Sequence, residues 1–158
     1  MYNWFIDNRD LIKHLAVNVG TTLNPVYKTI CTTSEVKLNT ELEQKDFYVY
    51  CDAIKRKIVT GAEVSLEGTL KLDVNNEGDI ALLDKAHTLI AQGEIAQFSN
   101  IGIQFDLLSG VNEGVLEYTT YQANVTLTLS DIGGNAEDEA GMSFTMSFIG
   151  TATEVASA

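Results

Sequence analysis

Apolar and polar residues alternate with a period of two along residues 62–74 of the chain. Every even position from Val64 to Val74 is apolar or glycine, and the odd positions are Glu63, Ser65, Glu67, Thr69, Lys71 and Asp73. Because successive side chains of a strand point to opposite faces, this period predicts a strand with one face in the core and one in water. A slip of one residue would expose Leu66 and Leu70, so the register is strongly specified.

Other segments rich in β-branched and aromatic residues also predict strands, which are expected at 26–38, 101–108, 115–129 and 142–153. One helix is predicted at 79–92, with Asp79 as a candidate N-cap and Gly93 as its stop signal. Its apolar residues recur on one helical face: Leu82, Leu83, Ala86, Leu89 and Ile90. The pattern therefore predicts a mainly β fold, an antiparallel β-sandwich or open barrel with one flanking α-helix.

Two segments depart from this pattern. Residues 1–15 are predicted to form an N-terminal arm, with 16–158 as a single domain. The aromatic residues of the arm, Tyr2, Trp4 and Phe5, are expected to contact the domain or a neighbouring subunit, and the alternative is a disordered terminus. Residues 39–60 are predicted to be a long loop, which in a compact domain tends to be functional or mobile.

Charge excludes one class of function. The chain has 22 acidic and 10 basic residues, a formal net charge of -12. Affinity for nucleic acid phosphates comes from Lys and Arg, so this balance argues against a nucleic-acid-binding protein. The only basic cluster, at 55–57, is a candidate contact with acidic surface on another subunit, or else a solvated patch.

The two cysteines, Cys31 and Cys51, form no CxxC pair, and charges within residues 7–10 interrupt any signal-like stretch. A reduced, intracellular chain is therefore expected. No apolar run reaches the roughly 20 residues of a membrane helix, so no membrane partner is expected.

Candidate chemistry is sparse. Residues 73–84 partly match a calcium loop, but an Asp stands at position twelve and a strand precedes the loop, which favours a plain turn into a helix. His14 and His87 are the only histidines, and a Cys–His pair between His87 and either Cys31 or Cys51 stays open on the sequence alone. Since no nucleophile, zinc or phosphate-binding motif is present, we expect no enzyme activity, no metal and no cofactor.

Two segments carry a resemblance to a known family. Residues 21–74 run "TTLNPVYKTICTTSEVKLNTELEQKDFYVYCDAIKRKIVTGAEVSLEGTLKLDV", and residues 118–155 run "YTTYQANVTLTLSDIGGNAEDEAGMSFTMSFIGTATEV". An early loop precedes a G-x-x-x-S-x-x-G strand, a helix follows, and two late strands are joined by a turn rich in Gly and acid. In this order of elements the sequence resembles the major tail tube proteins of long-tailed bacteriophages, over about residues 16–155.

The resemblance implies a virion protein that forms stacked six-subunit rings around a channel for the viral genome. Double-stranded DNA would pass without specific binding, and the partners would be other copies, a tape measure protein and further tail proteins. Assembly would take place in the cytoplasm of a host bacterium. Carried onto this chain, the channel lining would be Glu63, Ser65, Glu67, Thr69, Lys71 and Asp73. The loop between rings would present Lys45, Asp46, Phe47, Tyr48, Val49, Tyr50, Lys55, Arg56 and Lys57.

The charge pattern is compatible with this reading, because carboxylates on the polar face would repel DNA phosphates and let DNA pass. Two alternatives stay open. One is a monomeric β-barrel that binds a small apolar molecule, and the other is a capsid-decoration or tail-completion protein.

Overall fold

The computed structural model describes residues 7–21, 23–30, 33–49, 52–93, 95–137 and 139–155. Strands make up most of this part of the chain. In chain order the elements are α1 Asn8–Leu11, β1 Ile12–Asn18, β2 Tyr27–Thr29, β3 Thr33–Val49, β4 Asp52–Lys71, α2 Glu77–Gln92, α3 Ala96–Ser99, β5 Ile101–Asn112, β6 Val115–Ser130, β7 Gly141–Phe148 and β8 Thr153–Glu154.

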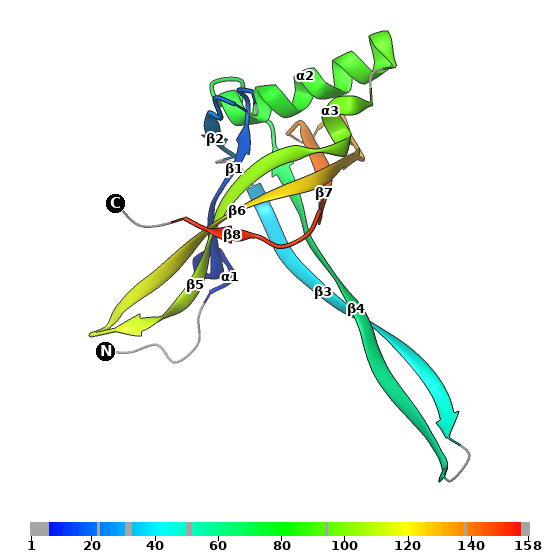
Figure 1. The fold of residues 1–158 in the computed structure, drawn as a ribbon. Coiled ribbons are helices and arrows are strands. Elements are labelled where there is room, and N and C mark those ends of the chain that lie inside the picture. The colour runs from blue at the N-terminus through cyan, green and yellow to red at the C-terminus, as the bar shows by residue number, and fades with distance from the viewer. Residues whose placement is uncertain are drawn as a thin grey trace.

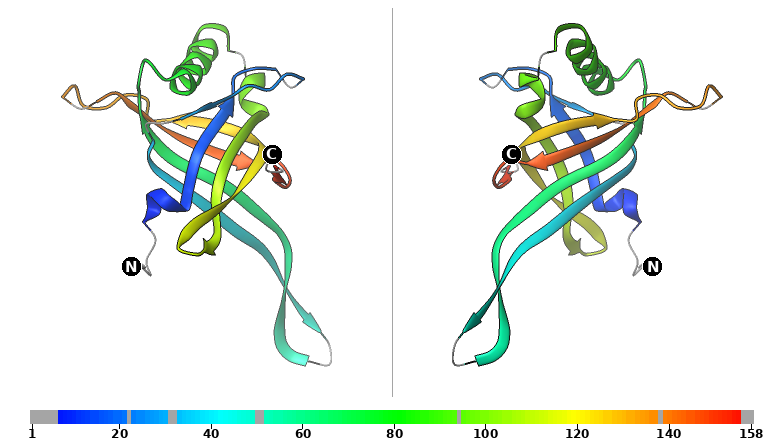
Figure 2. Two further views of the ribbon diagram at one scale, coloured as in Figure 1. Left: turned by 90° about the vertical axis from the view of Figure 1, so that its left-hand side faces the viewer. Right: turned by 90° about the vertical axis from the view of Figure 1, so that its right-hand side faces the viewer.

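All the strands belong to one antiparallel sheet in the order β2-β1-β5-β6-β7-β4-β3, and β8 adds to β6. The sheet is strongly curved, and α2 lies across one open end of the curve (Figures 1 and 2). The predicted mainly antiparallel open barrel with one flanking helix is therefore confirmed.

The core fills the concave side of the sheet. Leu66 and Leu70 of β4 pair with Met146 and Met142 of β7, and all four side chains are buried. The rest of the buried cluster comes from alternate strand positions, from α2 and from the residue that follows β2: Leu15, Val17, Ile30, Leu82, Ile101, Ile103, Phe105, Ala123, Val125, Leu127 and Phe144. The period-two pattern of 62–74 thus assigned the apolar face of β4 correctly.

Helix α2 begins two residues before the predicted start. Its N-cap is Asn76, whose side chain accepts hydrogen bonds from the main-chain N–H groups of Gly78 and Asp79. The expected cap, Asp79, instead lies buried in the first turn and accepts from the N–H of Asp73 at 3.1 Å. Gly93 ends the helix in the left-handed conformation at φ 64°, as predicted.

The sheet covers only part of the predicted apolar face of α2. Leu82 and Ala86 are buried, but Leu89 is 41% exposed and Ile90 83% exposed. The last turns therefore extend beyond the sheet, which covers the apolar face only along the earlier part of the helix.

The predicted loop at 39–60 is a β-hairpin. The β3–β4 ladder continues from Leu38↔Leu66 out to Val49↔Asp52, far beyond the rest of the sheet (Figure 1). Every residue from Thr40 to Tyr48 is exposed. A strand pair that projects from the core needs no apolar face, so this part of the hairpin lacks the alternation from which a strand is predicted.

Strand β1 starts inside the predicted arm, at Ile12, so the last residues of that segment pair with the sheet. The strand contains a bulge: the pairing with β5 shifts between Lys13 and Ala16, and His14 has φ 54°. Leu15, Ala16 and Val17 are consequently buried in succession, which breaks the period of two. Tyr2, Trp4 and Phe5 lie outside the described residues.

Two further strand predictions need revision. The segment 26–38 contains β2 and the start of β3 as separate strands. The segment 142–153 splits into β7 and β8, with Gly150 at φ 79° between them. The positive φ redirects the chain. The pairing of β7 with β6 ends at Val125, and β8 then pairs with Tyr121 and Gln122 of β6.

Gly68 provides a test of the packing between β4 and β7. It pairs with Phe144, and an added Cβ would meet the main-chain oxygen of Glu35 and lie 2.8 Å from the Phe144 ring. Gly68→Ala should lower the free energy of unfolding by about 1–3 kcal/mol, because strand and ring must both shift. Urea unfolding followed by circular dichroism measures this.

Gly110→Ala in β5 is the matched control, since its Cβ would meet nothing within 4 Å. We expect a change within about 0.5 kcal/mol there. Equal effects at the two glycines would contradict this packing.

Candidate functional site: a polar sheet face and a projecting hairpin

The convex side of the sheet is its polar face. On β4 this face carries Glu63, Ser65, Glu67, Thr69 and Lys71, which alternate with the core-facing positions. Five of the six predicted lining residues therefore share one surface. Asp73 does not belong to it, because β4 ends at Lys71 and the Asp73 carboxylate accepts from the N–H of Asn75 in the turn before α2.

The strand register extends the polar face over four strands. Three rows run from β3 through β4 and β7 to β6: Glu35–Thr69–Ser143–Ser130, Lys37–Glu67–Thr145–Thr128 and Asn39–Ser65–Ser147–Thr126. The side toward β6 is therefore covered by hydroxyl groups, and the charges gather toward β3.

The long alternating segments 115–129 and 142–153 were also candidates for the channel lining, and they contain β6 and β7, but sequence reasoning missed the contribution of β3 to this face. The alternate Ser and Thr positions of 126–130 and 143–147 were a usable signal. The strand registers that align these positions with Glu67 could not be read from the sequence.

The polar face remains acidic after its ion pairs are taken into account. The two lysines of the face are paired, Lys37 with Glu35 at 2.9 Å and Lys71 with Glu139 of the β6–β7 connection at 2.9 Å. In the sequence, Lys71 is a basic residue among the mainly acidic charged residues predicted for this face. Its ion pair with Glu139 offsets that positive charge. Glu41 lies directly opposite Glu63, and both side chains are exposed, so like charges stand side by side at the start of the hairpin.

These pairs shift pKa values in the expected directions. A hydrogen bond with Glu35 raises the pKa of Lys37, and the negative charge of Glu67 adds to that effect. The hydrogen bond from Lys71 lowers the pKa of Glu139. Both lysines of the face lie in ion pairs, which leaves acidic and neutral groups to set its potential.

The projecting hairpin has an aromatic residue and two cations on each of its faces. By alternation and register, Lys45, Phe47 and Arg56 share one face, and Tyr48, Lys55 and Lys57 share the other. The Tyr48 side chain is 72% exposed, and Asp46 pairs with Lys55 at 2.9 Å. Val49 ends β3, and Tyr50 lies outside the described residues.

The two ends of the molecule carry opposite charge. The hairpin tip lies at one end, and the β6–β7 connection lies near the other end, on the side of α2 (Figures 1 and 2). That connection presents Asp131, Glu137 and Glu139, all exposed. Among the described acidic and basic side chains, the hairpin tip is thus a basic surface and the β6–β7 connection an acidic one.

The sequence-level candidates for chemistry are scattered. His87 is exposed on α2, and Cys31 and Cys51 lie outside the described residues. The calcium-loop match at 73–84 forms the turn that caps α2, with Asp84 exposed within the helix. No three His, Cys, Asp or Glu side chains of the described part of the chain are grouped to hold a metal ion. None of the described helices combines the length and hydropathy needed to cross a membrane.

His14 is the exception, because it belongs to a small polar network. Its Nδ1 lies 2.8 Å from the Asp106 carboxylate, which also accepts a hydrogen bond from the Thr120 hydroxyl at 2.6 Å. The His14 side chain is 71% exposed. The network holds the β1 bulge against β5 and β6, so its evident role is structural.

Comparison with known proteins identifies the fold. The tail of an empty gene transfer agent particle, solved with C6 symmetry, matches with a TM-score of 0.59 and 15% identity over 96% of this chain and 100% of that one. The SPP1 tail tube matches with a TM-score of 0.56 and 13% identity over 92% and 76%. A native gene transfer agent virion chain matches at 0.54 and 14% over 90% and 96%.

By sequence, the chain matches no protein-family model and no curated protein. The structural matches show that the chain has the fold of tail tube proteins. They support the resemblance of the sequence to that family along almost the whole length of the chain.

The Lys71–Glu139 pair makes a testable prediction. Because Lys71 lowers the pKa of Glu139, Lys71→Met should raise that pKa toward its usual value, which NMR titration of the side-chain carboxyl would show. A carboxyl whose folded pKa is lowered stabilises the fold above its unfolded pKa and loses this contribution as pH falls through the folded value. The wild-type contribution should thus be lost on acidification, and the variant should lack it. An unchanged Glu139 pKa in the variant would show that the pair does not persist in solution.

Proposed function

We propose that this chain is a structural subunit of a phage-type tail tube. Copies form six-membered rings, the rings stack into a hollow tube, and the tube conducts the genome into a host cell. The observation that carries the proposal is a tail-tube fold over nearly the full chain with a continuous polar, acidic sheet face. The role is mechanical, and it requires no catalytic group and no cofactor.

The polar face would line the channel. Its exposed carboxylates, among them Glu63 and Glu67, would repel DNA phosphates, and its Ser and Thr hydroxyls would stay hydrated. DNA would therefore pass without being held. Before DNA, a tape measure protein would occupy the channel, and other tail proteins would bind the tube ends. The assembled protein would reside in the virion tail after assembly in the cytoplasm of a host bacterium.

Ring formation would resolve the edges of the sheet. Within the described residues, β2 and β3 are the outer strands, and β3 is long. A long strand edge pairs readily with other chains, and closure into a ring removes such edges. The six-fold number follows the symmetry of the gene transfer agent tail.

Stacking would use the two oppositely charged ends. The contact is head to tail, since the hairpin of one copy meets a different surface, the β6–β7 connection, on a copy of the next ring. Contacts of this kind do not close on themselves and so generate open, growing assemblies. Phe47 and Tyr48 would supply apolar contact area, and the basic residues around them would meet Asp131 and Glu137.

Removal of the hairpin aromatics tests the stacking. Phe47→Ala with Tyr48→Ala should leave a folded subunit that no longer forms tubes, because both side chains are exposed at the hairpin tip and support no core. Electron microscopy and sedimentation over a range of concentrations measure tube formation. Val111→Ala on the β5–β6 hairpin is the control, since it also removes a half-exposed apolar side chain from a strand end.

Each outcome has a distinct meaning. Tubes of normal length and stability from the double variant would refute the stacking role of the hairpin. Wild-type protein that forms only discrete rings would indicate a tail-completion protein, and a stable monomer that holds an apolar ligand would indicate a binding barrel.

Charge reversal tests the proposed partner surface. Arg56→Glu with Lys57→Glu should prevent stacking, because the hairpin would then face the acidic connection with like charge. Asp131→Lys with Glu137→Lys in the same chain should restore tubes. Length distributions from electron microscopy at low and high salt provide the readout, and Lys85→Glu on α2 is the control. Failure of the second pair of substitutions to rescue assembly would assign the basic tip to another partner.

A further inference from the structure

One edge of β6 lies open where its partner β7 ends. Strand β5 covers the first edge of β6 from Val115 to Val125. On the second edge β7 pairs only from Val125 to Ser130, so residues 115–124 have no neighbour in β7. An unpaired edge of this length is a template on which the strands of other chains can pair.

After β7 the chain returns to this edge as a short strap, residues 149–155. At the start of the strap the N–H of Ile149 donates to the carbonyl of Asn124 at 2.8 Å. At its end the N–H of Val155 donates to the carbonyl of Thr120 at 2.8 Å. Strand β8 lies between these two bonds and pairs with β6 (Figure 1). The strap therefore covers the β6 edge from one carbonyl to the other.

The covered part of β6 has the composition of an aggregation-prone strand. Residues 118–124 run "YTTYQAN", which contains two tyrosines and two threonines and no charged residue, proline or glycine. Tyrosine and threonine favour strands. Uncharged segments of this kind stack into cross-β fibres, and the amide side chains of Gln and Asn add to the stacking. As a free edge, this segment would pair with copies of itself.

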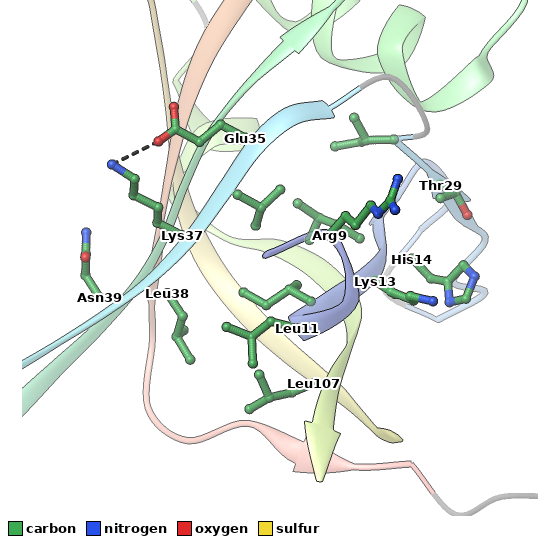
Figure 3. A pocket seen from close by; sticks show the side chains of 14 residues that line it. Arg9, Leu11, Lys13, His14, Thr29, Glu35, Lys37, Leu38, Asn39 and Leu107 are labelled. Carbon is green, nitrogen blue, oxygen red and sulfur yellow. Dashed lines mark ion pairs between the residues drawn. The ribbon is translucent and has the colours of Figure 1, made fainter. Parts of the chain in front are cut away.

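The long outer edge of β3 is protected in a different way. Its residues 35–39 line a cleft between β3 and β1, and Figure 3 shows the ion pair of Glu35 with Lys37 beside that cleft. Glu41 and Glu43 follow along the same strand. Charged side chains on an edge restrict its pairing to partners of complementary charge. Residues 118–124 carry no such charges, so their protection depends on the strap.

The strap itself is poorly suited to extend the sheet. Strand β8 has only two residues, both exposed, and one of them is the acidic Glu154. Gly150, at φ 79°, bends the chain before β8 begins. Short edge strands and edge charges are features by which proteins block association between sheet edges. The strap thus ends the sheet at a place where β6 alone would invite another strand.

We propose that residues 149–155 are a built-in edge protector, which covers β6 in the folded subunit and prevents fibre formation through residues 118–124. Protection of this kind keeps a chain with a long open strand usable at high concentration. The inference stands apart from the proposed tube, because it concerns misassembly of the single subunit, and the ring contacts proposed above use the edges of β2 and β3.

Gly150→Val tests the protector in the full-length chain. Valine is strained at φ 79°, and an added Cβ would meet nothing within 4 Å, so the substitution redirects the strap without crowding the core. The variant should stay folded by circular dichroism and form thioflavin-T-binding fibres several-fold faster than wild type. Gly133→Val is the matched control, since its φ of 107° is equally strained and its surroundings are equally open. It lies in the β6–β7 connection and should aggregate no faster than wild type.

Two further substitutions keep the test valid. Thr153→Pro loosens β8 at an exposed position, because proline has no N–H for the ladder, and it should act like Gly150→Val if that variant does not fold. Gln122→Lys, added to either strap variant, places a charge inside the segment 118–124. It should suppress the fibres even though the strap stays loose.

Three results would overturn the proposal. Strap variants that remain monomeric and free of fibres at all concentrations would show that the β6 edge needs no cover. Fibres that persist with Gln122→Lys would place the fibre contact outside residues 118–124. Hollow tubes in place of fibres, seen by electron microscopy, would mean that the strap restrains ordered assembly and not misassembly.

Discussion

The register of β4 against its two neighbours is the constraint on which the rest of the structure depends. Because β4 pairs with β3 along its length and with β7 over its last seven residues, its alternation over those seven residues assigns each side chain to the core or to the polar face. Leu66 and Leu70 fix the inward set, and Glu67 is then necessarily outward. A one-residue slip would cost the burial of these leucines, at roughly 1.5–3 kcal/mol each, and would bury a carboxylate.

The same alternation gives the sheet two separate uses. The concave side holds the subunit together, and the convex side is free to meet whatever passes over it. On the convex side, Lys37 and Lys71 are neutralised by ion pairs, so the electrostatic potential of that side comes from carboxylates. Hydroxyl groups cover much of the remaining surface. A surface of this kind is suited to contact without retention, in contrast to a binding site, which needs groups that attract the ligand.

Because the β3–β4 hairpin projects from the core, the residues proposed for assembly differ from those that stabilise the fold. Its exposed residues contribute little to the core, so aromatic and basic groups can be placed there without cost to the fold. The acidic β6–β7 connection at the other end is similarly free of core contacts. Two ends that differ in shape and charge favour a directional contact, which is the geometry a growing tube requires.

The sequence by itself determined the elements that have one face in the core and the other in water. Strand 62–74, the late strands and the stop of the helix at Gly93 all follow from local periodicity or backbone preference, and five of the six channel candidates were placed on one face. Tertiary structure alone decided the rest. The hairpin at 39–60 has no apolar face from which to predict a strand, and the bulge at His14 hides β1.

The composition of the polar face across strands depends on register, which links residues far apart in the chain. Glu67, Thr145 and Thr128 share a row only because β4, β7 and β6 pair as they do. Periodicity reports which way a side chain points relative to its own strand, but the neighbour it meets is set by the packing of the whole sheet.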